Sequence, residues 1–328
     1  MTLLVATHET VLRVDPASGR MHPASGLDEH HPTCLAADPR LPGRAWCGTS
    51  RGGVFRTDDG GETWRSQGLA EHRLMSLAAS PTEPDVVWAG TEPSEVWRSR
   101  DGGESWARTN PLTALPSSGS WAFPPRPDTH HVRWIACHPR EPGRLWVAVE
   151  AGALVSTADG GQSWRDRVPG GPYDTHELAV HPDAPETLRV AAGDGYFESF
   201  DGGGSWARLR AGLEVGYLRS VAIDPGDPNV VLVSASSGPR TAYVAGSGNG
   251  RLYRREGTGD WERVMHGWPR DPNTIAPLLL AGDRAGELWA ADERGLHRTD
   301  DAGVTWQMVV PFEETPNHLR ALVAVTAS

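Results

Sequence analysis

Residues 57–64 read T-D-D-G-G-E-T-W, and this stretch decides the fold because it recurs along the chain. Glycine readily adopts the backbone angles of a tight turn, and an Asp carboxylate can accept hydrogen bonds from amides a few residues further on. The tryptophan anchors the outgoing strand with a large apolar ring. We therefore predict that each copy, which we call the repeated turn, closes one hairpin of a repeated module. The other copies are S-R-D-G-G-E-S-W at 99–106, T-A-D-G-G-Q-S-W at 157–164, S-F-D-G-G-G-S-W at 199–206, T-D-D-A-G-V-T-W at 299–306 and a degenerate copy that ends at Trp261.

The same pattern of strands precedes each repeated turn. An apolar stretch that ends in Pro, such as C-L-A-A-D-P at 34–39, is followed by a second and a third short strand. In the first four modules, one second-strand residue precedes the Trp of the repeated turn by 18 positions: 46 and 64, 88 and 106, 146 and 164, and 188 and 206. This constant spacing predicts a module of four antiparallel strands, with the repeated turn between the third and the fourth.

Six modules fit the chain, and a fragment remains at each end. The modules lie at about residues 33–68, 74–109, 132–168, 176–210, 218–265 and 277–310, and the fragments are 2–21 and 318–325. Together the fragments supply the strands of a seventh module, and a closed array leaves no open sheet edges. We predict an all-β fold, a seven-bladed β-propeller of four-stranded antiparallel blades, closed by the N- and C-terminal strands in one blade. It would form a single domain over residues 1–328, and six blades would be left if the terminal fragments did not pair.

The repeated turn resembles the Asp-box, or BNR, repeat, whose motif is S-x-D-x-G-x-T-W. The resemblance covers nearly the whole chain, and the family includes sialidases, two-propeller xyloglucanases, sortilin-type receptors and photosystem II assembly propellers. It implies a β-propeller but little about activity, because in that family the motif lies on hairpins at the rim, away from the ligand site. The resemblance also implies a structural role for the aspartates of the repeated turn, which are Asp59, Asp101, Asp159, Asp201 and Asp301.

Composition excludes several classes of function. The formal net charge of −11 argues against a nucleic-acid or anionic membrane surface. All 31 basic residues are arginines, which excludes Schiff-base chemistry and a P-loop lysine. The cysteines Cys34, Cys47 and Cys137 lie in apolar strand patterns, which indicates buried free thiols. The N-terminal sequence lacks the features of a signal peptide, and no segment has the ~20 apolar residues of a membrane span, so we expect a cytoplasmic protein.

Two long insertions interrupt the regular spacing, at residues 110–131 and 236–250. In a propeller, the connections that hold them open on the same face, and long loops in compact domains are frequently functional. The residues before the inner strands and at the ends of the second strands should meet at the mouth of that face. Eight of the 13 histidines occupy such positions: His8, His30, His31, His72, His130, His131, His176 and His318.

The first functional hypothesis is a site for a small anionic or glycan-type ligand. Arg133, Arg219 and Arg320 occupy equivalent positions in three modules, so their guanidinium groups could converge on a carboxylate or phosphate. This looks similar to the arginine cluster of sialidases, but the F-R-I-P segment is missing and those enzymes have six blades, which disfavours sialidase activity itself. The predicted ligand-binding residues are His31, Arg73, Trp121, His131, Arg133, Arg219, His318 and Arg320.

Two further hypotheses are enzymatic and place an active site at the same mouth. For hydrolysis of the glycosidase type, the candidate catalytic residues are Glu150, His176, Asp194 and Tyr217. In a metal-dependent hydrolase or lyase, a divalent metal at the propeller axis would be held by His131, His176 and His318. The metal is the one cofactor that the sequence suggests, and no H-x-x-x-H or H-E-x-x-H spacing supports it.

The remaining hypothesis is a non-enzymatic assembly or scaffold propeller. Such a protein would bind a protein partner across the same face. Large exposed aromatic side chains are the usual anchors of such an interface. The insertion at 110–131 offers Trp121 and Phe123, which we expect to be exposed if this hypothesis holds.

Overall fold

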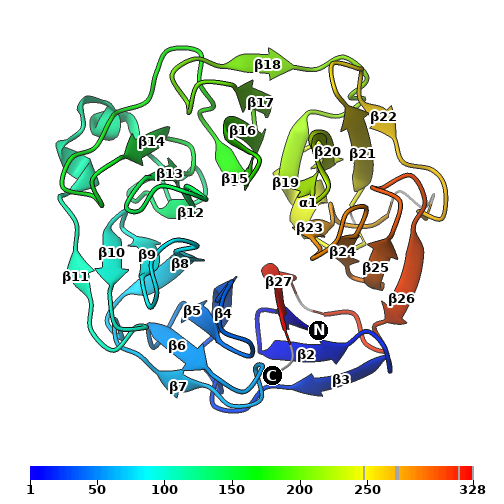
Figure 1. Cartoon of the computed structure of the whole chain (residues 1–328), viewed down its shortest axis with the longest axis horizontal. Coiled ribbons are helices and arrows are strands. Elements are labelled where there is room, and N and C mark those ends of the chain that lie inside the picture. Colours follow the sequence, from blue (N-terminus) through cyan, green and yellow to red (C-terminus); the bar gives the residue numbers. More distant parts are fainter. Residues whose placement is uncertain (247, 270–272, 317, 327–328) are drawn as a thin grey trace. The chain divides into compact units, whose positions relative to one another are not determined.

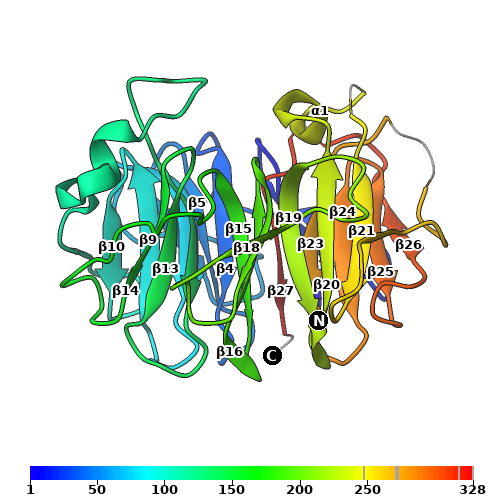
Figure 2. The same ribbon diagram turned by 90° about the horizontal axis from the view of Figure 1, so that it is seen from above.

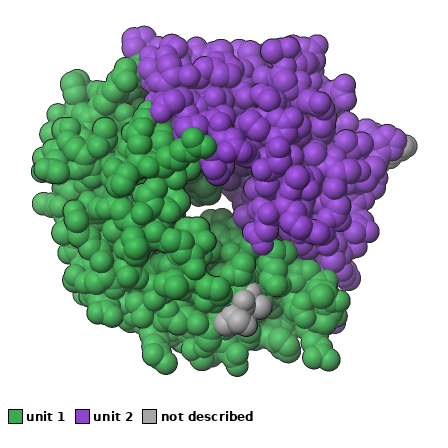
Figure 3. Space-filling model, in the orientation of Figure 1, with its two compact units in different colours: residues 1–168, 173–175, 320–328 green, residues 169–172, 176–319 purple. Residues whose placement is uncertain are grey.

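The computed structural model describes residues 1–246, 248–269, 273–316 and 318–326. Its regular structure is almost entirely β-strand, in seven antiparallel sheets. The chain divides into two compact units (Figure 3). Unit 1 comprises residues 1–168, 173–175 and 320–328, and unit 2 comprises residues 169–172 and 176–319.

Unit 1 contains four of the sheets (Figure 1). The sheet formed by the chain ends has the strand order β27-β1-β2-β3, and the next two follow the sequence as β4 to β7 and β8 to β11. The fourth has three strands, β12 to β14, and its outer edge is marked by a bridge between Ser156 and Arg165. The strands are β1 (Thr2–Ala6), β2 (Val11–Asp15), β3 (Arg20–Pro23), β4 (Pro32–Ala37), β5 (Ala45–Thr49), β6 (Val54–Thr57), β7 (Arg65–Ser66), β8 (Arg73–Ala79), β9 (Val87–Glu92), β10 (Val96–Ser99), β11 (Ala107–Arg108), β12 (Val132–Cys137), β13 (Leu145–Val149), β14 (Ala153–Thr157) and β27 (Ala321–Val325).

Unit 2 contains the other three sheets, and each follows the order of the sequence. The first residue of β15, Thr175, is assigned to unit 1. The strands are β15 (Thr175–His181), β16 (Ala184–Ala192), β17 (Gly195–Ser199), β18 (Ala207–Leu209), β19 (Tyr217–Asp224), β20 (Asp227–Ser236), β21 (Arg251–Glu256), β22 (Glu262–Arg263), β23 (Leu278–Ala281), β24 (Leu288–Asp292), β25 (Gly295–Thr299) and β26 (Gln307–Pro311).

The two chain ends share one sheet. β1 pairs with β27 over five residues, from Thr2 opposite Val325 to Ala6 opposite Ala321. This pairing confirms the predicted seventh blade and excludes the six-blade alternative. The fold class is therefore all-β, a seven-bladed β-propeller, as predicted. That the whole chain behaves as one domain stays a prediction.

The repeated turn has the same hydrogen bonds in all five copies. In the first copy, the Thr57 hydroxyl donates to Asp59 Oδ1 at 2.7 Å and accepts the Gly61 N–H at 2.9 Å. The Thr63 N–H and hydroxyl both donate to the Asp59 carboxylate. The equivalent bonds occur around Asp101, Asp159, Asp201 and Asp301. These aspartates therefore organise the turns, as the motif implied.

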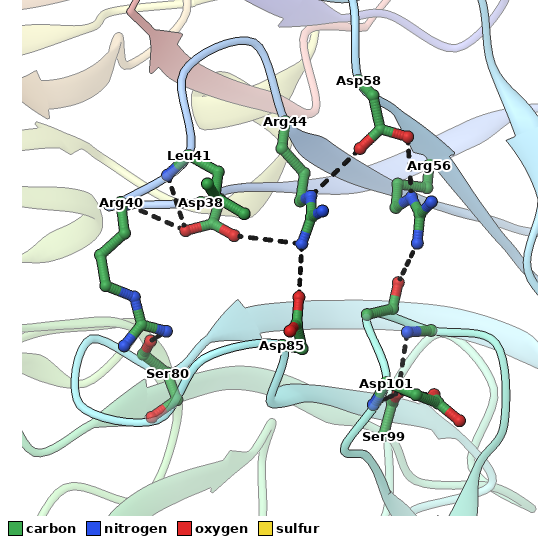
Figure 4. Close-up of polar contacts among 12 residues, drawn as sticks. Asp38, Arg40, Leu41, Arg44, Arg56, Asp58, Ser80, Asp85, Ser99 and Asp101 are labelled. Atoms are coloured by element: carbon green, nitrogen blue, oxygen red, sulfur yellow. Dashed lines mark hydrogen bonds and ion pairs between the residues drawn. The ribbon is translucent and has the colours of Figure 1, made fainter.

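Arginines on the third strands join neighbouring blades through the repeated turn. Arg13 Nε donates to the Gly60 carbonyl at 3.2 Å, and Arg56 Nη1 donates to the Gly102 carbonyl at 3.2 Å. In unit 2, Arg254 Nε donates to the Ala302 carbonyl at 2.8 Å. Gly60, Gly102 and Ala302 are equivalent positions of the turn. We call Arg13, Arg56 and Arg254 the inter-blade arginines (Arg56 in Figure 4).

A second arginine supports the contact between the first two blades. Figure 4 shows Arg44 between three aspartates. Its guanidinium group lies 3.1 Å from Asp58 of its own blade and 2.5 Å from Asp85 of the next, with Asp38 at 3.9 Å. Charged contacts therefore link these two blades at the end where their inner strands finish and their second strands begin.

Apolar side chains fill the layers between adjacent sheets. One layer of unit 1 joins Trp46 and Val54 of one blade to Leu74 and Val87 of the next. A layer of unit 2 is built in the same way from β19 to β21 on one side and β23 and β24 on the other. Cys34 and Cys47 are buried and Cys137 is half-buried, and all three are free thiols, as predicted. Burial raises the pKa of the Cys34 and Cys137 thiols to about 12, so they stay protonated at neutral pH.

The two insertions fold into short helical turns. Residues 110–131 contain the 3-10 helices η1 (Leu112–Ala114) and η2 (Pro116–Ser120), and residues 236–250 contain α1 (Pro239–Tyr243). Figure 2 shows the first insertion extending beyond the strand ends of unit 1 and α1 covering the beginning of β19 in unit 2. Among the described residues, no helix has the length and apolar composition needed to cross a membrane.

Candidate functional site

The insertion at 110–131 places two side chains over the ends of strands in unit 1. It closes on itself through hydrogen bonds from the Phe123 N–H to the Thr129 carbonyl and from the Arg126 N–H to the Phe123 carbonyl. This turn brings Arg126 to Glu92, the last residue of β9, and Phe123 to His131, which precedes β12. The insertion therefore forms part of the mouth of unit 1, the end where its inner strands begin.

Two glutamates and three arginines form a continuous set of ion pairs at this mouth. Arg126 binds Glu92 with both prongs of its guanidinium group, at 2.8 and 2.6 Å, and Arg73 Nε lies 3.6 Å from the same carboxylate. Arg133 Nε lies 3.5 Å from Glu150. His131 connects the two halves, and we call these six residues the arginine–glutamate cluster: Arg73, Glu92, Arg126, His131, Arg133 and Glu150.

His131 is held by a carboxylate on either side of its ring. Its Nε2 lies 2.7 Å from Glu150 Oε2, and because a carboxylate can only accept, Nε2 carries the hydrogen. Nδ1 lies 3.9 Å from Glu92 Oε2 and makes no hydrogen bond among the described residues. The ring is buried beneath Phe123, 4.7 Å between centroids. His131 therefore holds Glu150 in position through the hydrogen bond from its Nε2–H.

The exposure of the cluster is uneven. The carboxylates are buried, with side chains 8% exposed at Glu92 and 14% at Glu150, whereas Arg73 and Arg126 are 45% and 43% exposed. The three guanidinium groups contact Glu92 and Glu150, and a third carboxylate of unit 1, that of Asp174, lies within 4.8 Å of Glu150. The guanidinium groups of Arg73 and Arg126 therefore keep part of their surface open to solvent.

Histidines at the same mouth make mostly structural contacts. His31 stacks on His8, with ring centroids 4.8 Å apart, and its Nδ1 lies 3.3 Å from the His8 carbonyl. His72 packs on the Trp97 ring at 4.9 Å. Burial lowers the pKa of His130, and the neighbouring His131 lowers it further, so the His130 imidazole is neutral at physiological pH. These contacts bring His8 and His31 together but place neither His31 nor His72 in the arginine–glutamate cluster.

The Trp121 side chain is not exposed, although the protein-partner hypothesis expected it to be an exposed anchor. The side chain is buried, 6% exposed, in the core between the second and third blades. Its Nε1 donates to the Ser117 hydroxyl at 3.0 Å, and Ser117 in turn donates to Asp166. The ring is buried because the insertion folds back onto the core, which the spacing of Pro and Ser residues did not reveal. Phe123 is half-buried over His131 instead.

Two of the three arginines that the sequence placed at equivalent positions, Arg219 and Arg320, do not belong to the arginine–glutamate cluster. Arg219 is buried and donates to three backbone carbonyls of unit 2, those of Ala242 at 3.4 Å, Ala276 at 2.7 Å and Leu319 at 2.6 Å. Arg320 is exposed in unit 1, and its N–H donates to the Ala6 carbonyl. Arg219 therefore ties together three segments of unit 2, whereas Arg133 belongs to the arginine–glutamate cluster.

The remaining candidate catalytic residues lie in unit 2. His176, at the start of β15, lies next to Tyr217, at the start of β19, with Nε2 3.3 Å from the Tyr217 hydroxyl. Asp194 is half-buried in the turn between β16 and β17. His318 is exposed and has a positive φ of 54°. For the predicted metal, His131 belongs to unit 1 while His176 and His318 belong to unit 2, so this ligand set stays a prediction.

Sequence reasoning assigned no role to Arg126 and no binding role to Glu92. Arg126 lies in an irregular Pro-rich loop without an equivalent in the other blades, so alignment of the repeats could not place it. One signal was available, because Arg126 is the only arginine between residues 110 and 131. Glu92 was recognisable as the end of a second strand, the position that Glu150 occupies in the next blade.

No family model matches this chain, and no curated protein matches it. Several solved structures match this chain. An ancestral GH74 enzyme matches with a TM-score of 0.65 and 17% identity over 84% of this chain and 38% of its own. The GH74 xyloglucanase from Xanthomonas campestris matches with a TM-score of 0.71 and 17% identity over 94% of this chain and 52% of its own. YCF48 bound to D1 peptide matches with a TM-score of 0.61 and 19% identity over 93% of this chain and 83% of its own.

These similarities concern the fold. At 17–19% identity, they show that the chain shares its β-propeller architecture with glycan-acting and peptide-binding proteins. The chain spans only 38% and 52% of the length of the two GH74 enzymes. Function must therefore be argued from the residues of this chain.

Proposed function

We propose that this chain is an Asp-box-type β-propeller that binds a small anionic or glycan-type ligand at the arginine–glutamate cluster of unit 1. The observation that carries the proposal is the pairing of two half-exposed arginines, Arg73 and Arg126, on one buried carboxylate, Glu92. Glu92 orients both guanidinium groups while leaving much of their surface open. Planar guanidinium groups bind carboxylates and phosphates with two parallel hydrogen bonds.

Aromatic side chains make an acidic sugar a suitable ligand class. Phe123 lies beside the cluster with Arg126 stacked on its ring at 4.8 Å. Tyr173 is 42% exposed, and its carbonyl accepts the Gly152 N–H two residues beyond Glu150. Sugars present an apolar face that such rings can contact and hydroxyl groups that Glu150 can accept from. A uronic acid combines this face with the carboxylate that the arginines favour.

The test is calorimetric titration with an oligosaccharide that ends in glucuronic acid and with its neutral counterpart that ends in glucose. The acidic sugar should bind and the neutral sugar should bind at least ten times more weakly, because a charge-assisted hydrogen bond contributes about 1.5–3 kcal/mol. Arg126→Ala should weaken binding of the acidic sugar by about tenfold or more. Arg65→Ala, an exposed arginine on β7, is the matched control and should leave the affinity unchanged.

Equal binding of both sugars, or binding that Arg126→Ala leaves intact, would contradict the proposal. Hydrolysis would be detected in the same samples by the release of reducing ends. Loss of hydrolysis with retained binding in Glu150→Gln would assign Glu150 a catalytic role, in line with its contact to His131.

The other candidate functions have less support from the described residues. A protein partner bound through Trp121 is disfavoured, because that side chain lies in the core. A metal enzyme would need His131 as a ligand, whereas its Nε2 already donates to Glu150. Metal analysis of the untagged protein checks this, and one equivalent of a divalent metal that is lost in His131→Ala would favour the metal enzyme instead.

A further inference from the structure

Two buried arginines of unit 2 share one carboxylate at the contact between the fourth blade, β15 to β18, and the fifth, β19 to β22. Arg189 lies on β16, Glu198 on β17 and Arg255 on β21 (Figure 1). Arg189 Nη1 and Arg255 Nη2 both donate to Glu198 Oε2, the second at 3.2 Å. We call Arg189 and Arg255 the buried arginine pair, because their side chains are only 4% and 6% exposed. Neither belongs to the arginine–glutamate cluster.

The buried arginine pair carries more positive charge than its carboxylate balances. Glu198 is the one carboxylate that either guanidinium group contacts within the described part of the chain. Tyr196 also donates to Glu198, at 3.3 Å, and burial raises the pKa of this phenol well above its ordinary value, so it stays neutral. Two guanidinium groups and one carboxylate therefore leave one positive charge in the interior, where an uncompensated charge is costly.

Three buried N–H groups at this contact have no acceptor among the residues that the structure describes: Arg189 Nε, Arg255 Nη1 and Trp261 Nε1. Trp261 is the tryptophan of the degenerate turn, and its ring centre lies 5.7 Å from the guanidinium carbon of Arg255. Buried donors in native proteins are nearly always paired, so an acceptor from outside the chain fits here. In four intact copies of the turn, the indole N–H donates to a backbone carbonyl instead: Trp64, Trp106, Trp164 and Trp306.

Two departures from the repeat create this contact. In the first blade Trp46 is opposite Arg56, whereas in the fourth blade Arg189 is opposite Glu198. In the fifth blade, Arg255 occupies the position of the Ser or Thr that begins each intact turn. Both replacements bring a charged side chain to a contact that is otherwise mostly apolar, which favours a local function over a requirement of the fold.

We infer that the buried arginine pair and the Trp261 indole bind a small monovalent anion of the halide type, such as chloride. A halide ion only accepts hydrogen bonds and does so from several directions, so it can serve all three donors, and its charge balances the pair. A water molecule could accept some of these bonds but would leave the charge uncompensated. Because the surrounding side chains are almost fully buried, a monatomic ion suits this contact better than a sugar or a carboxylate. This inference does not depend on the ligand proposed for unit 1.

Bromide tests the site directly, because it replaces chloride and scatters X-rays anomalously. Crystals of the full chain are soaked in sodium bromide, and the anomalous map is inspected at the contact between the fourth and fifth blades. We expect a bromine peak within hydrogen-bonding reach of Arg189, Arg255 and Trp261. A map without a peak at these three residues would overturn the inference and leave the buried arginine pair as an architectural contact.

Thermal melting shows whether the anion binds in solution. The protein is melted in sodium chloride and in sodium gluconate of equal ionic strength, since gluconate is too large for a buried monatomic site. A ligand that binds only the folded state raises the melting temperature, so the measured quantity is the difference between the two salts. Trp261→Phe keeps an aromatic ring and removes the N–H donor, and should reduce this difference by about 2 °C or more. Trp64→Phe, the same change in the first repeated turn, is the matched control and should leave it unchanged.

Arg255→Ser removes the excess charge itself. It restores the residue type of the intact turns and leaves Arg189 and Glu198 as an electrically neutral pair. We therefore expect the bromine peak to disappear and the salt difference to fall at least as far as in Trp261→Phe. A peak that persists in Arg255→Ser, or a salt difference that is equal in Trp261→Phe and Trp64→Phe, would contradict the inference. If Arg255→Ser does not fold, the comparison of the two tryptophan variants decides.

Discussion

At the residue scale, the aspartate of each repeated turn accepts several hydrogen bonds on its two carboxylate oxygens. Protonation of the carboxylate would weaken or remove some of these bonds. In the second copy, the hydroxyl and N–H of Ser105 and the hydroxyl of Ser99 lower the pKa of Asp101 from its usual 3.8 to about 2. The same bonds lower the pKa of Asp159 and Asp201 to about 2. A carboxyl group whose pKa is lowered by folding stabilises the folded state above its unfolded pKa.

This shift predicts a loss of stability in acid. Because the folded pKa lies below the unfolded one, the contribution of Asp101 is complete above about pH 4 and is lost as the pH falls towards 2. Asp101→Ala should therefore lose more stability relative to the wild type at pH 6 than at pH 2.5. Urea unfolding at the two pH values measures this difference, and an equal effect of the substitution at both would contradict it.

One alanine occupies a position where the other four intact copies have glycine. Ala302 has a φ of 57°, and the equivalent Gly60 has a φ of 74° with no atom within 4 Å of the position a Cβ would take. Because a Cβ is disfavoured at positive φ, Ala302→Gly should stabilise the fold and Gly60→Ala should destabilise it, each by about 1 kcal/mol. Chemical denaturation of both variants checks the prediction, and the same sign for both would refute it.

The roles of some individual residues could be predicted from the sequence, and those of others could not. The aspartates of the repeated turn could be assigned because their partners lie within four residues along the chain. Arg219 could not, because its three carbonyl partners come from segments up to 100 residues away. The exposure of Trp121 that the protein-partner hypothesis required is not found, and the sequence could not show this because the burial of Trp121 depends on how an irregular loop folds onto the core.

At the scale of the element, the repeated turn has two functions. It closes a hairpin of its own blade, and its fourth residue offers a carbonyl to an inter-blade arginine of the preceding blade. The strands and their order could be predicted because each blade repeats the same local pattern. The contact between blades could not, because the arginine and the carbonyl that it binds lie in different copies, 46 to 48 residues apart.

The inter-blade arginines should contribute measurably to stability. Arg56 binds both the Gly102 carbonyl and Asp58, and its side chain is 19% exposed. Arg56→Ala should lower the free energy of unfolding by about 1–2 kcal/mol, because the partly buried carbonyl loses a charged donor. Arg65→Ala on the neighbouring strand is exposed and should change it by less than about 0.5 kcal/mol. Equal effects of the two substitutions in guanidinium unfolding would show that the contact adds nothing.

At the scale of the whole molecule, the fold depends on the pairing of the two chain ends. β27 covers the edge of β1 and buries Leu322 and Val325. The sequence predicted this pairing because one fragment lacks an inner strand and the other supplies one. The arginine–glutamate cluster could not be predicted to the same degree, because it joins side chains of two blades and a loop that has no counterpart in the repeat.

Removal of residues 320–328 should expose this edge. An unpaired strand edge promotes association between chains. We expect the shortened protein to melt at a lower temperature and to associate, and a synthetic peptide of residues 320–328 should reverse both effects. Thermal melting and size-exclusion chromatography provide the measurement. A shortened protein that is as stable and as monodisperse as the full chain would show that β27 is dispensable.

The binding of an acidic ligand at the arginine–glutamate cluster is most directly tested by a crystal soaked with 4-bromobenzoate, an unreactive carboxylate that carries an anomalous scatterer. Oriented and half-exposed, Arg73 and Arg126 should hold the carboxylate, and the anomalous map should show bromine beside them. The peak should disappear in crystals of Arg126→Ala and persist in crystals of Arg65→Ala. Bromine bound at other arginines, with none at Arg73 and Arg126, would contradict the proposed site.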